Sequence, residues 1–277
     1  MNFDFNEEQT MIMDGIARYI REEYDFDRRR SIIESDSAYS DDVWRQFSEL
    51  GWLSIPFDES YGGFGGHADD LAGVMLELGK GLIIEPYMST VVVFGSLLNA
   101  SNNDSLKEQL IPRIINGQYK GSFAYAEEQS RFEISDVKTS AQKCGDGYKL
   151  NGTKIAVIDA KESDGLIVTA RTGGSQYGAE GISLFLVDTS AEGVAVSSYN
   201  TMDSHSSSTI NLENVFVTEA NLIVDEGEGF RHIESCLPQI LLCLSAEALG
   251  IMEVLNKLTV EYSCLLYTSP SPRDAES

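Results

Sequence analysis

Basic residues are scarce in this 277-residue chain. Twenty Lys and Arg stand against 44 Asp and Glu, which leaves a formal net charge of −24. A surface of this sign repels nucleic acid and anionic lipid, so we expect neither as a partner. The same charge is typical of a soluble cytoplasmic protein, and we expect that location.

Cysteine and histidine are also rare. The four cysteines are Cys144, Cys236, Cys243 and Cys264. They show no CxxC or His-paired spacing, which predicts reduced, buried thiols rather than disulfides or a metal site. The three histidines are His67, His205 and His232. They are isolated in the sequence, so we expect surface or capping roles and neither a metal site nor a catalytic triad.

Long apolar runs are missing. We find no stretch of about 18 apolar residues, and therefore predict no membrane span. The first ten residues, MNFDFNEEQT, contain neither a basic segment nor an apolar run, so they do not form a signal peptide. The apolar fraction of 42% still supports real hydrophobic cores, and the length allows two or three packed units.

Residues 1–120 have the pattern of a helical domain. Asn6-Glu7-Glu8-Gln9 resembles a capping box, and Ser40-Asp41-Asp42 caps a second helix that Gly51 ends. Further helices are predicted over 69–80, 89–99 and 105–115. The β-branched run Val91–Val93 also allows a strand in the second of these.

Residues 121–224 have the opposite pattern, with short β-rich runs about ten residues apart. Gly145-Asp146-Gly147 separates two such runs and predicts a hairpin, because Gly and Asp adopt positive φ easily. We expect an antiparallel barrel or sandwich here.

Residues 225–262 predict the first helix of a C-terminal helical-bundle domain. Its apolar stripe runs from Ile233 to Leu258, and Pro238 should kink or break it early. One helix cannot bury such a stripe alone, so we expect the natural protein to continue. Residues 263–277, SCLLYTSPSPRDAES, resemble a cloning scar and are expected to be a non-native tail. The predicted fold class is therefore α+β.

The order of helices, a small β domain and helices resembles the acyl-CoA dehydrogenase family over nearly all of residues 1–262. Similar motifs are LGWLSIPFDESYGGFGG, ELGKGLIIEPY, AEEQSRFEISDVKTSA, GDGYKLNGTK, GEGF and SAEALGIMEVLNKLTVEY. Together they most resemble the branch named for the small subunit of pimeloyl-CoA dehydrogenase.

The resemblance implies FAD between the β domain and the C-terminal helices, and an acyl-CoA substrate. A carboxylate would remove the α-proton of the thioester while the β-hydrogen leaves as hydride to the flavin. It also implies an electron-transfer partner and a homo- or hetero-oligomer.

The family's flavin-facing strand corresponds to Phe123–Glu127, with contacts from Phe123 and from the backbone of Tyr125 and Ala126. Many members have Thr where this chain has Ala126. The next family turn is replaced by Gln129–Phe132. Arg131 could bind a flavin or CoA phosphate and Phe132 could pack on a ring, or Arg131 could simply pair with Glu128 or Glu133 on the surface.

A second flavin-facing segment of the family corresponds to Ala156, Val157 and Ile158. Backbone contacts from Val157 and Ile158 to the flavin are implied, although no aromatic ring shields the cofactor there. Read without the family, the same residues are a buried strand. The polar run Ser204–Ser208 corresponds to a loop that often touches flavin or substrate, but a polar turn is the favoured interpretation.

No catalytic residue is assigned. A minority of the family places the catalytic Glu where this chain has Ile240, and the neighbouring substrate-binding positions carry Pro238 and Leu241. Glu247 could be a buried carboxylate with a raised pKa, although an ion pair at the helix edge is favoured.

We therefore expect a piece of an FAD-dependent acyl-CoA dehydrogenase, inactive as it stands. The alternatives are a non-catalytic subunit of a heteromeric dehydrogenase and a flavin oxidase or monooxygenase on the same fold.

Overall fold

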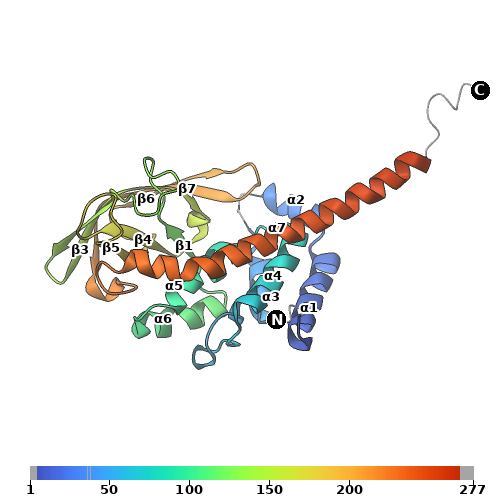
Figure 1. The fold of residues 1–277 in the computed structure, drawn as a ribbon, viewed down its shortest axis with the longest axis horizontal. Helices are drawn as coiled ribbons and strands as arrows, with labels where there is room; N and C mark the ends of the chain where they lie inside the picture. The colour runs from blue at the N-terminus through green and yellow to red at the C-terminus, as the bar shows by residue number, and fades with distance from the viewer. Residues whose placement is uncertain (1–4, 36, 38, 269–277) are drawn as a thin grey trace, which may run out of the picture.

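The computed structural model describes residues 5–35, 37 and 39–268. It contains a helical layer, a curled β-sheet and one long helix that runs past both (Figure 1). This arrangement confirms the predicted α+β class.

The N-terminal layer is helical throughout. Its helices are α1 (Glu7–Glu23), α2 (Phe26–Ile33), α3 (Asp41–Glu49), α4 (Ala68–Lys80), a π-helical segment (Met88–Phe94), α5 (Gly95–Asn99) and α6 (Asp104–Ile115). The predicted capping box is present, because the Gln9 amide donates to Asn6 Oδ1 while the Asn6 amide donates to Gln9 Oε1. Val91 and Val92 lie in a helix and are fully buried, so core packing outweighs their preference for strands.

Seven strands form the sheet: β1 (Gly121–Ala124), β2 (Ser140–Cys144), β3 (Gly147–Ile158), β4 (Gly165–Arg171), β5 (Ile182–Asp188), β6 (Val194–Asn200) and β7 (Ser206–Thr218). The order is β1-β4-β2-β3-β7-β6, with β5 beside β4. The predicted hairpin is β2–β3, which turns at Gly145-Asp146. Most pairs are antiparallel as expected, but β1 pairs with β4 in parallel.

Helix α7 (Gly229–Thr268) is the longest element and runs beside α4 (Figure 1). It continues through Pro238, so of the predicted kink or break, the break is wrong. His232 Nε2 lies 2.8 Å from the Leu97 carbonyl, and Gln239 Nε2 donates to Ser96 Oγ. These contacts dock the segment around Pro238 against α5 and the residues beside it.

Helix α7 extends into the segment expected to be a non-native tail. Residues 263–268 continue the helix, and the non-native origin of residues 263–277 stays a prediction. The Ser-Pro-Ser-Pro part of that tail lies outside the described residues. The helix leaves many apolar side chains exposed: Leu244, Leu249, Met252, Leu255, Leu258, Val260 and Tyr262.

One stretch of α7, Gly229–Cys264, is long and apolar enough to cross a membrane by length and composition alone. Single polar residues interrupt this stretch, so the sequence shows no unbroken apolar run of about 18 residues. A core helix of a soluble protein passes the same test, so this is weak support for a span.

Only half of the cysteines are buried as expected. Cys236 and Cys243 are buried, whereas Cys144 and Cys264 are exposed.

Candidate active site

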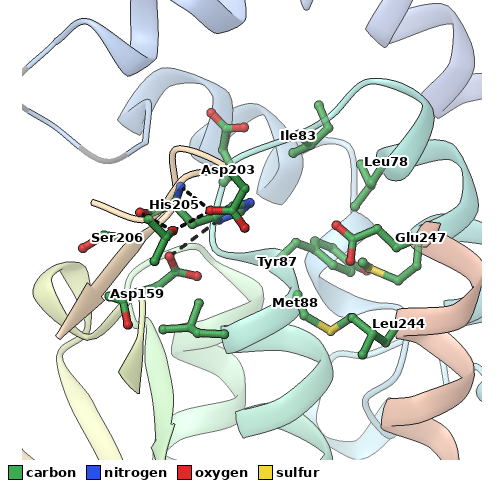
Figure 2. Close-up of a pocket in the computed structure, with 15 residues that line it drawn as sticks. Leu78, Ile83, Tyr87, Met88, Asp159, Asp203, His205, Ser206, Leu244 and Glu247 are labelled. Carbon is green, nitrogen blue, oxygen red and sulfur yellow. Dashed lines mark hydrogen bonds and ion pairs between the residues drawn. The ribbon is translucent and has the colours of Figure 1, made fainter. Parts of the chain in front are cut away.

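A cavity of about 230 Å³ lies where the N-terminal helices, the sheet and α7 meet (Figure 2). One part of its wall is mainly apolar: Met75, Leu78, Ile83, Tyr87, Met88, Ile158 and Leu244. The other part is polar: Glu85, Asp159, Thr201, Asp203, His205, Ser206, Ser207 and Glu247. The cavity is therefore built from all three regions of the chain.

Asp159 is held at the end of β3 by its neighbours. It has a positive φ of 56°, and Ser89 Oγ donates a 2.6 Å hydrogen bond to its Oδ2. The other oxygen, Oδ1, lies 4.0 Å from His205 Nδ1, a buried nitrogen without a hydrogen-bond partner. The nearby carboxylate raises the pKa of His205, although burial opposes it.

The turn before β7 brings Asp203 and His205 to the cavity. The Thr201 amide donates to the His205 carbonyl at 2.9 Å, and the His205 amide donates to Asp203 Oδ1. Arg29 Nη2 donates to the Asp203 carbonyl and so ties this turn to α2. Ser206 and Ser207 begin β7 beside it. The Ser204–Ser208 run thus contributes cavity wall as well as turn.

Two glutamates reach the cavity from the helical elements. Glu85 is only 3% exposed, its Oε2 has no hydrogen-bond partner, and burial raises its pKa to about 7. Glu247 projects from α7 into the cavity (Figure 2), and burial raises its pKa as well, opposed by the charge of His205. The expected ion pair of Glu247 is not found within the described ranges. Glu85, with its pKa of about 7, can exchange a proton near neutral pH.

The two segments predicted to face a flavin lie side by side. The Ile155 amide donates to the Ala126 carbonyl at 2.9 Å, where β3 leaves its register with β7 between Lys154 and Val157. Ala156 and Ile158 are exposed, and Val157 is buried. This short stretch is therefore part of a strand with one buried residue, and it also exposes two side chains to a ligand.

Contacts to both its ring and its backbone carbonyl hold Tyr125 in place. Its ring stacks on Phe123 with 5.2 Å between centroids. Its carbonyl accepts from Lys154 Nζ at 3.3 Å, and the fully buried Lys154 also donates to Glu127 Oε1 and Thr169 Oγ1 at 2.6 and 2.7 Å. The carbonyls of Tyr125 and Ala126 both have partners within the protein, and contact of this backbone with a flavin stays a prediction.

Comparison with known protein families divides the chain into the same helical and β regions. Residues 6–118 match the acyl-CoA dehydrogenase N-terminal domain, and residues 122–215 match the acyl-CoA dehydrogenase middle domain. The chain carries these two domains of the acyl-CoA dehydrogenase family.

Similar proteins include a probable acyl-CoA dehydrogenase of Bacillus subtilis, 29% identical over 95% of this chain and 70% of that protein. Mitochondrial isovaleryl-CoA dehydrogenase of Pongo abelii is 27% identical over 93% of this chain, which spans 62% of that protein's length. The structure of butyryl-CoA dehydrogenase from Megasphaera elsdenii superimposes with a TM-score of 0.85 at 24% identity. That match covers 95% of this chain and 70% of the other, and it shows the shared fold.

The family implies FAD, and the residues present fit its flat ring system. Tyr125, Ala156 and Ile158 expose an uncovered surface on adjoining segments, and Ile158, 56% exposed, also lines the cavity. An apolar side chain left open at a cavity mouth suits a planar aromatic ligand.

Two other residues carried over from acyl-CoA dehydrogenases lie apart from this surface. Phe132 is 97% exposed and packs on no ring within the described chain, and Arg131 is exposed with a positive φ of 51°. Arg131 forms no ion pair with Glu128 or Glu133. Neither residue lines the cavity.

Ile240, at the position where a minority of the family has its catalytic Glu, lies in an apolar environment. Ile240 is half-buried and packs against the helical core, while Leu241 is exposed. Among the described residues of α7, Glu247 is the acid that reaches the cavity.

Sequence reasoning missed Asp159, His205, Glu85 and Lys154. His205 was assigned to a surface or cap, and only His67, which begins α4, caps a helix. Asp159 and His205 are 46 positions apart, so no local pattern joins them. The Lys in GTKIAVI sits on a strand directly before an apolar run, and that was the one local indication of a buried charge.

Proposed function

We propose that the protein is an FAD-dependent oxidoreductase that desaturates an acyl-CoA thioester between Cα and Cβ. The observation that carries this proposal is the cavity bounded by the helices, the sheet and α7, which is lined in part by the exposed Ile158 of the predicted flavin surface. The membership of the acyl-CoA dehydrogenase family supports it.

Bound FAD would supply the hydride acceptor for this reaction. Tyr125, Ala156 and Ile158 would hold its ring, and Lys154 would keep the Tyr125 segment in place through its carbonyl. Met75, Met88 and Leu244 would exclude water from the acyl chain. Glu247, whose pKa burial raises, would place a carboxyl group inside the cavity.

The proposal extends to assembly and subtype. We infer a cytoplasmic protein of the pimeloyl-CoA dehydrogenase small-subunit type, in a homo- or hetero-oligomer that passes electrons to a partner. The exposed apolar side chains of α7 support an oligomer, because apolar patches of this kind mark interaction surfaces.

A non-catalytic subunit is the second candidate, and Ile240 at the minority base position favours it. A flavin oxidase or monooxygenase on the same fold would differ in producing peroxide or an oxygenated product.

The test begins with FAD binding. We expect weak binding by the purified chain, and at least about tenfold weaker binding by Ile158→Asp, because a charge at the ring surface must be desolvated. Flavin absorbance and fluorescence quenching measure both. Phe216→Asp is the matched control, since Phe216 is exposed near the opposite end of β7. Equal loss in both variants, or none in Ile158→Asp, would contradict the assignment of this surface.

The same preparation distinguishes the candidates. We expect no acyl-CoA-driven dye reduction by the chain as given. Robust turnover would refute the absence of a base, and peroxide formed with acyl-CoA would favour the oxidase.

A further inference from the structure

The cavity has an unusual balance of charge. Four acidic side chains line it, from Glu85, Asp159, Asp203 and Glu247, and none of its described lining residues is Lys or Arg. His205 faces Asp159, but Asp203 and Glu247 have no ion-pair partner within the described chain. Arg29 lines a neighbouring pocket and donates hydrogen bonds to the carbonyls of Leu82 and Asp203.

Glu85 gives a separate indication of a ligand. Its side chain is almost entirely buried, it lines the cavity, and Oε2 has no hydrogen-bond partner. Its Oε1 accepts a long bond, 3.4 Å, from the Ser40 amide, and a hydrogen bond with the Tyr24 hydroxyl lowers the pKa of Glu85 against the larger effect of burial. A buried carboxylate oxygen without a partner costs free energy unless a ligand supplies the missing donor.

The rest of the wall indicates the kind of cation. The described residues contain no group of three or more His, Cys, Asp or Glu that could hold a metal ion. Instead the acids share the cavity with Met75, Leu78 and Leu244. An apolar wall beside unpaired carboxylates suits an organic cation with a short carbon chain, which can satisfy both.

We propose that the cavity binds an organic monocation, and that the natural acyl group ends in a protonated amine held by these carboxylates. The acyl-CoA part of this statement rests on the proposed function. The cation site does not, because it requires neither flavin nor thioester.

The binding should depend on pH. Because the pKa of Glu85 is raised to about 7, its proton must leave before it can pair with a cation, so affinity rises between pH 6 and pH 8. Besides the cavity's own acids and His205, Glu85 faces Tyr19 and Tyr24, whose pKa values are raised by burial and which stay neutral in this range. Loss of a proton from His205 acts in the same direction, because it removes a competing positive charge.

The experiment uses n-butylammonium and its neutral counterpart 1-butanol, titrated calorimetrically into the full chain without flavin. We expect butylammonium to bind at least about tenfold more tightly than butanol, and about tenfold more tightly at pH 8 than at pH 6. Glu85→Gln and Glu247→Gln should each weaken butylammonium binding, and Glu85→Gln should flatten the pH dependence. The exposed Glu234→Gln on the same helix as Glu247 should leave it unchanged.

Equal affinity for the two probes, or ammonium binding that survives both cavity variants, would overturn the proposal, since the acidic surface alone would then explain it. If Glu85→Gln does not fold, as judged by circular dichroism, Glu247→Gln and the pH series of the unaltered chain decide. The two proposals can be told apart. A chain that binds FAD but not butylammonium would support the proposed function and contradict the cation site. A chain that binds butylammonium but not FAD would support the cation site and contradict the proposed function.

Discussion

Lys154 shows how one buried charge can organise a surface that a ligand touches. Its ammonium is fully enclosed and bonds to Glu127, Thr169 and the Tyr125 carbonyl, so it joins β3, β4 and the segment after β1. Burial alone would raise the pKa of Glu127, but the charge and hydrogen bonds of Lys154 outweigh it and hold that pKa at about 2. The Lys154–Glu127 ion pair therefore holds the segment that carries Tyr125, part of the predicted flavin surface, in place.

Replacing Lys154 by Met should lower the free energy of unfolding by about 3–5 kcal/mol at pH 7, because it leaves the Glu127 charge buried and unpaired. Urea unfolding followed by circular dichroism measures this. The folded pKa of Glu127 lies below its ordinary value near 4.5, so its contribution is present above pH 4.5 and lost as the pH falls toward 2. The difference in free energy of unfolding between the unaltered chain and Lys154→Met should therefore decrease as the pH falls from 4.5 toward 2.

Lys143→Met is the matched control, because it breaks an exposed ion pair with Glu219 and should change little. A similar effect from both substitutions would mean that the Lys154 pair has no special role.

At the scale of elements, the contact between α4 and α7 sets the position of Glu247. A side chain on Gly250 would meet the Leu76 carbonyl, and one on Gly79 would meet the Glu247 carbonyl. Both contacts involve backbone, which cannot move aside as a flexible side chain can. The two helices therefore approach closely only because both positions are glycine, and this approach closes the cavity.

Gly250→Ala should destabilise the protein by about 1–3 kcal/mol through overpacking, and should displace α7 from α4. Thermal unfolding gives the first effect, and weaker butylammonium binding reports the second. Gly15→Ala is the control, since nothing lies within 4 Å of the added carbon and Ala favours the helix by roughly 0.5–1 kcal/mol. If Gly250→Ala behaves like Gly15→Ala, the helices are not held by this contact.

At the scale of the whole molecule, a strongly acidic surface surrounds one exposed apolar stripe. The stripe comprises Leu249, Met252, Leu255, Leu258 and Tyr262 of α7. The net charge of −24 keeps copies apart at low salt, and screening removes this repulsion as ionic strength rises. The two features act in opposite directions on association.

We expect self-association that increases with salt, measured by sedimentation velocity. The double substitution Leu255→Glu with Leu258→Glu should abolish it, because it removes apolar contact area. Asn256→Glu with Thr259→Glu adds the same charge on the exposed part of the same helix and should reduce association much less. Equal effects of the two pairs would assign the association to charge rather than to the stripe.

Local chemistry accounts for what could be predicted. The Asn6 capping box, the Gly145-Asp146 hairpin turn and the 3.6-residue periodicity of α4 each depend on neighbours within a few positions, and the structure has all three. The helix does not break at Pro238, and contacts of α7 with α5 hold the segment around this residue. The parallel β1–β4 pair joins segments 44 positions apart, which no turn pattern encodes.

The sequence by itself determined the α+β class, the acidic surface and the resemblance to a flavin-binding family, because composition, periodicity and motif order are properties of the chain. Only the tertiary structure decided that Glu85, Asp159, Asp203, His205 and Glu247 share one cavity. Their charge and burial come from surroundings contributed by distant elements, so neither the raised pKa of Glu85 nor its unpartnered oxygen can be read from the residues next to it.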